Sequence, residues 1–326
     1  MKAKETSHWA LPATYVPRPV LEEQVVSAAN ARRRLMLSGR VGSGRMTLAY
    51  CALAAAGYEV HVVDLLGVVT AADLNRAFRQ LGGTEPMPLA LRTLNEAARK
   101  RPVALVVSNL DGCRGMDDED AIVGSLRSQL QMARDLAVFY TVSDEPFIGR
   151  HVGSSSGALF KQCTILDVGP LDFEEASALW QKRGTPVSET ALAVLGDSIG
   201  MFAADHVAFA SRMEGLRSAA GHPGGTPCDE TEMRTELYRL VNENKARYEA
   251  WAHSFLTGRQ LALLAAVARG LPLRASKEMS AATGIPVRAL GTNMKAVQKS
   301  GCMVRRGDGW AFADPCFRLH LMARVP

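Results

Sequence analysis

The sequence has no apolar run near the length of about 20 residues that a membrane-spanning helix needs. Its amino terminus, MKAKETSHWALPATYVPRP, has no apolar core of the kind that marks a secretory signal. The six cysteines are scattered without a CxxC pair, which argues against a zinc site or a disulfide framework. These absences predict a cytoplasmic protein with no membrane partner and no structural metal.

The chain also lacks a large net charge, with +5 over 326 residues. That charge is unevenly distributed. From Trp251 to the carboxyl terminus there are 11 Lys/Arg against 3 Asp/Glu, a net +8, so the first 250 residues carry −3. A basic carboxyl-terminal segment favours a polyanionic partner.

Apolar and β-branched runs alternate with helical patterns in the first half of the chain. Strands are predicted over 33–38, 58–65, 102–112 and 136–144, and helices over 46–57, 71–83, 89–101 and 119–135. This alternation predicts an α/β fold with a parallel sheet. After Pro170 only helical patterns remain, over 171–184, 188–215 and 230–256, with a loop over 219–230.

A glycine-rich stretch, GRVGSGRMT, lies between the first predicted strand and helix. Glycines at these positions let backbone amides face an anion at a helix amino terminus, as in the phosphate loop G-x-x-x-x-G-K-[ST]. The alternative is a strand–helix turn that binds nothing. The predicted nucleotide-binding residues of this loop are Gly39, Gly42, Ser43, Gly44, Arg45, Met46 and Thr47.

Four positions that nucleotide hydrolysis normally uses are altered. Arg45 replaces the lysine, and Met46 replaces the hydroxyl that would bind magnesium. Ser108 and Asn109 follow a buried strand where Asp and Glu would be expected. Because each such electrostatic contact is worth about 3–4 kcal/mol in the transition state, we expect little or no ATPase activity. No catalytic residue and no metal ligand are predicted. ATP or ADP would therefore bind without a magnesium ion that the protein coordinates.

Three further polar residues are candidates for the same site. Ser108 ends the third strand, and Asp111 follows it within an Asp-Gly turn. A simple turn is favoured over a displaced metal ligand for Asp111. Ser143 follows the next strand, where it would either meet a terminal phosphate or cap the next segment.

Several segments resemble the prokaryotic AAA+/STAND-type P-loop ATPases, which include archaeal-type ATPases and origin-recognition-like proteins. The stretch 15–25, YVPRPVLEEQV, is similar to the box that opens these proteins, with Arg18 at the box arginine. The stretch 168–179, VGPLDFEEASAL, resembles the start of their helical lid, and WAFADPCFR resembles the end of their carboxyl-terminal domain. At 199–207 only Gly200 survives of the family pattern, and no second-sensor arginine can be assigned.

The resemblance implies an AAA+-like P-loop sheet over 1–169, a helical lid and linker over 170–248, and a winged-helix domain over 249–326. It places Arg18 at the nucleotide site, and it implies protein partners or a homo-oligomer.

The basic tail by itself predicts a helix–turn–helix followed by a hairpin. Helices are expected over 257–270, 275–285 and 286–301, with Thr257 as the first cap and a hairpin turning at RGDG. In such a fold the third helix enters the major groove of double-stranded DNA. The candidate DNA-binding residues are Arg288, Thr292, Asn293, Lys295 and Lys299 on that helix and Arg305 and Arg306 on the hairpin.

The sequence therefore favours a DNA-binding regulatory or assembly subunit with a degenerate nucleotide site. Two alternatives stay open. One is an active ATPase whose missing groups come from partner subunits in a ring, as arginine fingers do. The other is a protein–protein scaffold whose winged helix binds no DNA.

Overall fold

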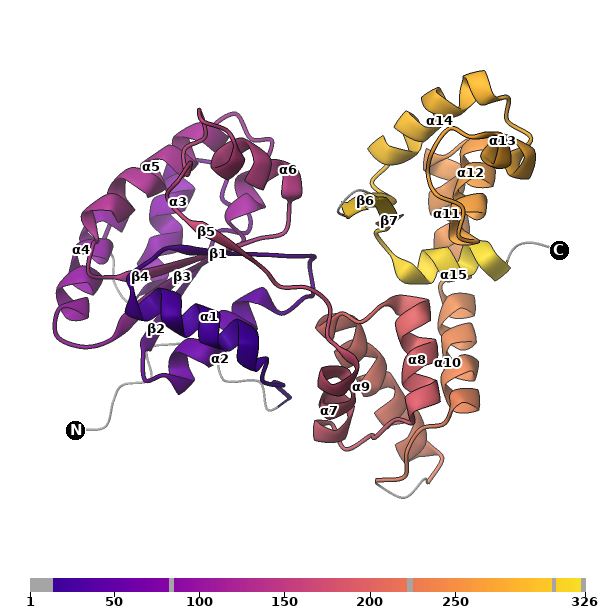
Figure 1. The fold of residues 1–326 in the computed structure, drawn as a ribbon, viewed down its shortest axis with the longest axis horizontal. Helices are drawn as coiled ribbons and strands as arrows, with labels where there is room; N and C mark the ends of the chain where they lie inside the picture. Colours follow the sequence, from indigo (N-terminus) through magenta and orange to yellow (C-terminus); the bar gives the residue numbers. More distant parts are fainter. Residues whose placement is uncertain (1–13, 82–84, 222–224, 307–308, 324–326) are drawn as a thin grey trace. The chain divides into compact units, whose positions relative to one another are not determined.

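The computed structural model describes residues 14–81, 85–221, 225–306 and 309–323, and the chain forms two compact units (Figure 1). The first unit comprises Met1–Arg183 and Phe202–Phe209, and the second comprises Gly184–Met201 and Ala210–Pro326. The division at residues 169/170 and 248/249 stays a prediction.

The first unit contains a five-stranded parallel sheet in the order β2-β3-β4-β1-β5. Its strands are β1 (Leu35–Ser38), β2 (Glu59–Asp64), β3 (Val103–Ser108), β4 (Ala137–Val142) and β5 (Thr164–Asp167). The four predicted strands are present, which confirms the parallel α/β architecture. The edge strand β5 was not predicted, because only one of its four residues is buried and it has no apolar run.

Helices cover both faces of this sheet (Figure 1). One face carries α1 (Pro19–Asn30) and α2 (Arg45–Ala55), and the other carries α3 (Ala71–Phe78), α4 (Met87–Ala98) and α5 (Glu119–Met132). The side chains of β3 alternate between the two cores: Leu105 and Val107 pack with α3–α5, whereas Ala104 and Val106 pack with α1 and α2. This two-sided burial explains why β3 is a continuous apolar run.

Shorter elements complete the first unit. They are α6 (Glu145–Ile148), a π-helical turn at Gly149–Gly153, α7 (Phe173–Lys182), the start of α9 (Ala203–Ala219), and 3-10 turns at Arg79–Leu81 and Leu110–Cys113. Trp180 of α7 is fully buried, and its indole N–H donates to His206 Nδ1 of α9 at 3.1 Å. The glycines of the π-helical turn interrupt any helical pattern, so this region was not predicted.

A carboxylate at the start of α5 holds the π-helical turn. Glu119 accepts hydrogen bonds from Arg150 Nη2 at 2.5 Å and from the Gly115 backbone N–H at 2.7 Å, and its Oε1 lies 2.8 Å from His151 Nε2. Burial raises the pKa of Glu119, but these hydrogen bonds outweigh burial and lower the pKa to about 2.

The second unit contains the remaining helices and a two-stranded antiparallel hairpin. They are α8 (Glu189–Ile199), most of α9, α10 (Glu230–Glu243), α11 (Lys245–Phe255), α12 (Gly258–Ala268), α13 (Lys277–Thr283), α14 (Val287–Lys299), β6 (Met303–Arg306), β7 (Gly309–Phe312) and α15 (Pro315–Ala323). Thr257 caps α12 as predicted, by accepting from the Gln260 backbone N–H. The helical stretch predicted over 230–256 is divided at Asn244 into α10 and α11.

The carboxyl-terminal helix α15 packs against several other helices of this unit. Helix α15 contacts α8 and α10, and Arg318 of α15 donates to the backbone carbonyls of Asp197 and Ala268 at 3.2 Å. Helix α14 packs against α12, α13 and β6 through Leu290 and Val297. Within the described ranges, no helix is long and apolar enough to cross a membrane.

Candidate functional site: the glycine loop and helix α14

The glycine loop after β1 has a backbone conformation that favours glycine at three of its positions. Gly39 has φ +149°, and a Cβ there would lie 2.5 Å from the Val168 carbonyl oxygen. Gly42 and Gly44 have φ +89° and +86°. Gly44 is the N-cap of α2, and no side chain caps this end of the helix. The first amides of α2 therefore have no partner from a capping side chain.

A buried hydroxyl in the same loop also lacks a partner. Ser43 is 4% exposed, and its Oγ has no hydrogen-bond partner among the described residues. A buried polar group without a partner is destabilising unless a ligand or water satisfies it. The orphaned hydroxyl and the uncapped helix end together fit the oxygens of a phosphate group.

Arg45 occupies the position of the phosphate-loop lysine, but its side chain bonds to the protein's own backbone. The guanidinium donates through Nη1 to the Gly39 carbonyl and, at 2.7 Å, to the Val142 carbonyl at the end of β4. Arg45 is only 8% exposed. Burial lowers the pKa of its guanidinium, and the charge of Asp111 opposes that shift.

The polar residues that end β3 bond to neighbouring strands. The Asn109 backbone N–H donates to Thr141 Oγ1 at 3.0 Å, and Asn109 Nδ2 donates to Asp64 Oδ1 at 2.8 Å. Ser108 is buried, with its Oγ 3.4 Å from Thr141 Oγ1. These contacts occur because β2, β3 and β4 are parallel neighbours whose carboxyl ends meet at one sheet edge.

Asp111 and Ser143 form a pair between the loops after β3 and β4. Asp111 Oδ2 accepts from the Ser143 backbone N–H at 2.8 Å and from Ser143 Oγ at 2.6 Å. Of the two alternatives for Ser143, capping is wrong: the side chain that caps α6 is that of Asp144, which accepts from the Phe147 N–H. Asp111 lies in the expected turn after β3.

The donor set of the loop does not suit a magnesium ion. Mg²⁺ prefers oxygen ligands in octahedral geometry. Met46 offers a thioether, and its side chain packs with the core beneath α1 and α2. The adjacent Thr47 is half-buried in the first turn of α2. In the part of the chain that the structure describes, no cluster of three His, Cys, Asp or Glu side chains could hold a metal.

The beginning of α9 contacts the glycine loop directly. The Ala204 backbone N–H donates to the Gly42 carbonyl at 3.0 Å. Arg40 pairs with Asp205 at 2.9 Å, and its guanidinium lies 4.7 Å from the ring centre of Phe202. Sequence reasoning missed this contact, because Arg40 and Asp205 are 165 positions apart and no local pattern links them.

Arg18, which the resemblance places at the nucleotide site, uses all of its guanidinium nitrogens within the protein. Its Nε donates to Glu175 at 3.0 Å, and its two Nη atoms donate to the carbonyls of Gly169 at 3.1 Å and Pro170 at 2.8 Å. Arg18 therefore fastens the connection between β5 and α7 to the start of α1.

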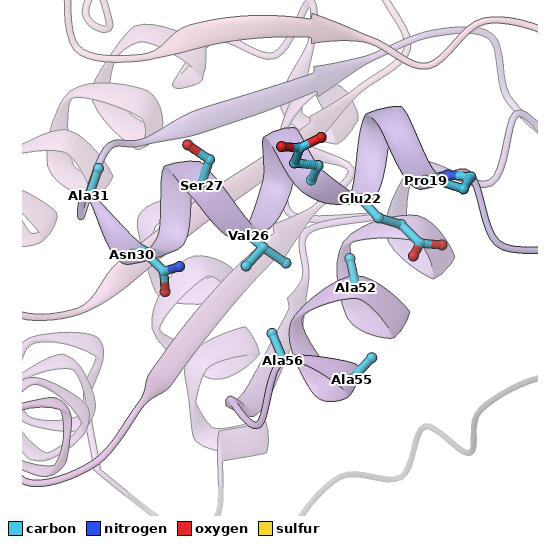
Figure 2. Close-up of a pocket in the computed structure, with 10 residues that line it drawn as sticks. Pro19, Glu22, Val26, Ser27, Asn30, Ala31, Ala52, Ala55 and Ala56 are labelled. Atoms are coloured by element: carbon cyan, nitrogen blue, oxygen red, sulfur yellow. The ribbon is translucent and has the colours of Figure 1, made fainter.

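A groove of about 800 Å³ lies between α1 and α2 and contains none of the predicted site residues (Figure 2). Its α2 side is formed by Ala52, Ala55 and Ala56, and its α1 side includes Glu22 and Asn30. The Tyr15 hydroxyl donates to Glu22 at 2.5 Å, and burial together with this carboxylate raises the pKa of Tyr15.

The second candidate surface is the exposed side of α14 and the hairpin. Arg288, Thr292, Lys295 and Lys299 are exposed. Asn293 differs from them, because it is half-buried and its Nδ2 donates to the Ala289 carbonyl at 2.8 Å.

On the hairpin, Arg305 is exposed and pairs across the strands with Trp310. The Arg306 side chain and residues 307–308 of the predicted RGDG turn lie outside the described residues.

No family model and no curated protein matches this sequence. Solved structures do match over nearly the full length. A Walker-type ATPase of Pyrococcus abyssi has 13% identity and a TM-score of 0.64, covering 94% of this chain and 96% of that one. The Aeropyrum pernix ORC2 protein, solved in ADPNP–ADP complexes, has 14% identity and a TM-score of 0.60, with coverages of 98% and 97%. Aeropyrum pernix ORC1 in complex with DNA has 11% identity and a TM-score of 0.51, with coverages of 96% and 94%. The fold is therefore that of the AAA+ P-loop ATPases.

Proposed function

We propose that this chain, which has the fold of the AAA+ P-loop ATPases, is a DNA-binding regulatory or assembly subunit that binds nucleotide weakly or not at all and does not hydrolyse it. The observation that carries the proposal is the position of Arg45. Arg45, the cation at the lysine position of the phosphate loop, is bonded to the carbonyls of Gly39 and Val142 instead of facing solvent.

The loop keeps backbone amides and a hydroxyl that can bind phosphate, but it has lost the side chains that would promote phosphate hydrolysis. ATP or ADP would be held by the backbone amides of residues 39–47 and by the Ser43 hydroxyl, and the guanidinium could join them only by giving up its bonds to carbonyls. Met46 stands in place of a hydroxyl, and Ser108 and Asn109 are bonded to neighbouring strands, so these three residues do not hold magnesium or orient water. The ADPNP–ADP complexes of the ORC2 neighbour support nucleotide as the ligand class.

The DNA-binding half of the proposal rests on the exposed basic side of α14. Arginine and threonine can contact base edges in the major groove, and lysine suits phosphates. The order of α12, α13, α14 and the β6–β7 hairpin supports the proposal of a winged helix. The ORC1 neighbour, solved in complex with DNA, supports duplex DNA as the partner.

A salt series of DNA-binding measurements tests the DNA half. We expect duplex affinity to fall steeply as salt rises, and we expect Lys295→Ala to weaken binding and reduce the slope of log K against log salt by about one. Lys245→Ala, at an exposed lysine of α11, is the matched control and should change neither quantity. Absence of salt-dependent binding would contradict the proposal and favour a protein–protein scaffold.

Phosphate release tests the nucleotide half. With magnesium and ATP, with and without DNA, turnover should stay at background. Robust turnover that Arg45→Ala removes would contradict the proposal and favour an active ring ATPase.

A further inference from the structure

Helix α14 contains a glycine at an interior position where neither the helix backbone nor its packing requires one. Gly291 is the fifth of 13 residues of α14, and it is exposed. Glycine is the least favourable residue after proline in a helix interior. A Cβ built on Gly291 would meet nothing within 4 Å, so internal packing does not require its absence.

Gly291 differs from the other helical glycines that have open space around them, because it lies beside exposed basic side chains. Gly124 and Gly215 also lie within helices with open space around them, in α5 and α9. At 100° per residue, Gly291 lies at one edge of an arc of about 100° that also contains the exposed residues Arg288, Thr292, Lys295 and Lys299.

We infer that Gly291 is the point at which the backbone of α14 comes closest to DNA, within van der Waals contact of a base edge in the major groove. This inference rests on the proposed DNA-binding function and extends it to a residue that has no side chain to donate or accept. The long side chains of Lys295, Arg288 and Lys299 lie on one side of Gly291 around the helix and would reach phosphates and bases there. A methyl group at position 291 would hold this edge of the helix away from the duplex. Glycine is used in this way wherever a backbone must approach a ligand closely.

The test compares two helical glycines in the same unit. The full-length chain, Gly291→Ala, Gly291→Leu and Gly215→Ala are measured against a duplex of about 30 base pairs, three helical turns, selected by the wild-type chain from a randomised pool. Both alanine variants should raise Tm by about 2 °C, because alanine stabilises an unstrained helical position. Gly291→Ala should weaken DNA binding about tenfold with an unchanged salt slope, and Gly291→Leu should weaken it further. Gly215→Ala should bind as the wild type does.

The outcomes separate this inference from the function on which it rests. Binding by Gly291→Ala and Gly291→Leu within twofold of a wild-type chain that does bind DNA would overturn the role of Gly291 alone. A fall in Tm for Gly291→Ala would also overturn it, because it would show an internal need for the glycine. A wild-type chain that selects no duplex would overturn the DNA-binding function and this inference together.

Discussion

Replacement of Arg45 by alanine tests the contact between its guanidinium and the backbone carbonyls of Gly39 and Val142. The guanidinium joins the first carbonyl of the loop to the end of β4, so it ties the turn after β1 to the neighbouring strand. Arg45→Ala removes both bonds and leaves a space in a region that is almost closed to solvent.

The size of the effect follows from opposing contributions. Each hydrogen bond from a charged donor contributes about 1.5–3 kcal/mol, which sets an upper limit of about 6 kcal/mol for the two. Burying a guanidinium costs several kcal/mol of hydration, and the lowered pKa of Arg45 reflects that cost. Water entering the space would also satisfy the two carbonyls. We therefore expect a net loss of about 1–3 kcal/mol in the free energy of unfolding.

Urea unfolding followed by circular dichroism measures this loss, and hydrogen exchange of peptides that contain β1 and β4 assigns it to the first unit. Arg134→Ala, at an exposed arginine of the same unit, is the matched control and should stay within about 0.5 kcal/mol of the wild type. If Arg45→Ala were as stable as that control, the guanidinium would not hold the loop to β4.

Three further predictions concern the first unit. Gly39→Ala should lower the free energy of unfolding by about 3 kcal/mol or more, because its Cβ would overlap the Val168 carbonyl; urea unfolding measures this loss. The control Gly149→Ala should not destabilise the chain, because a Cβ at Gly149 meets nothing within 4 Å. Glu119→Gln should destabilise the chain at pH 7. The pKa of Glu119 is lowered to about 2 from 4.5, so the extra stability of the wild type over Glu119→Gln is fully present above pH 4.5 and disappears as the pH falls toward 2. If urea unfolding gave the same stability difference throughout that pH interval, this prediction would be contradicted. The double variant Arg45→Lys/Met46→Thr should gain magnesium-dependent ATP binding in calorimetry, since it restores an ammonium and a hydroxyl; no gain would show that other residues block the site.

The elements that sequence could predict are those whose signal is local. The strands β3 and β4 are continuous apolar runs, and Thr257 marks the start of α12 because its hydroxyl caps the helix. The edge strand β5 gave no such signal, because it is short and mostly exposed.

The same distinction applies to the site. The glycines of the loop are recognisable because their spacing is fixed by the backbone conformation of a single turn. Arg45 reaches Val142, Arg40 reaches Asp205 and Arg18 reaches Glu175, over 97 to 165 positions, and these contacts follow from sheet order and helix packing, which no short motif encodes.

The most direct test of whether the loop binds phosphate without coordinating a metal is calorimetric titration with ATP. The wild-type chain is titrated once with magnesium present and once with EDTA. We expect the same weak Kd, within about twofold, in both titrations, or no binding in either. A Kd that tightens tenfold or more when magnesium is added would contradict it.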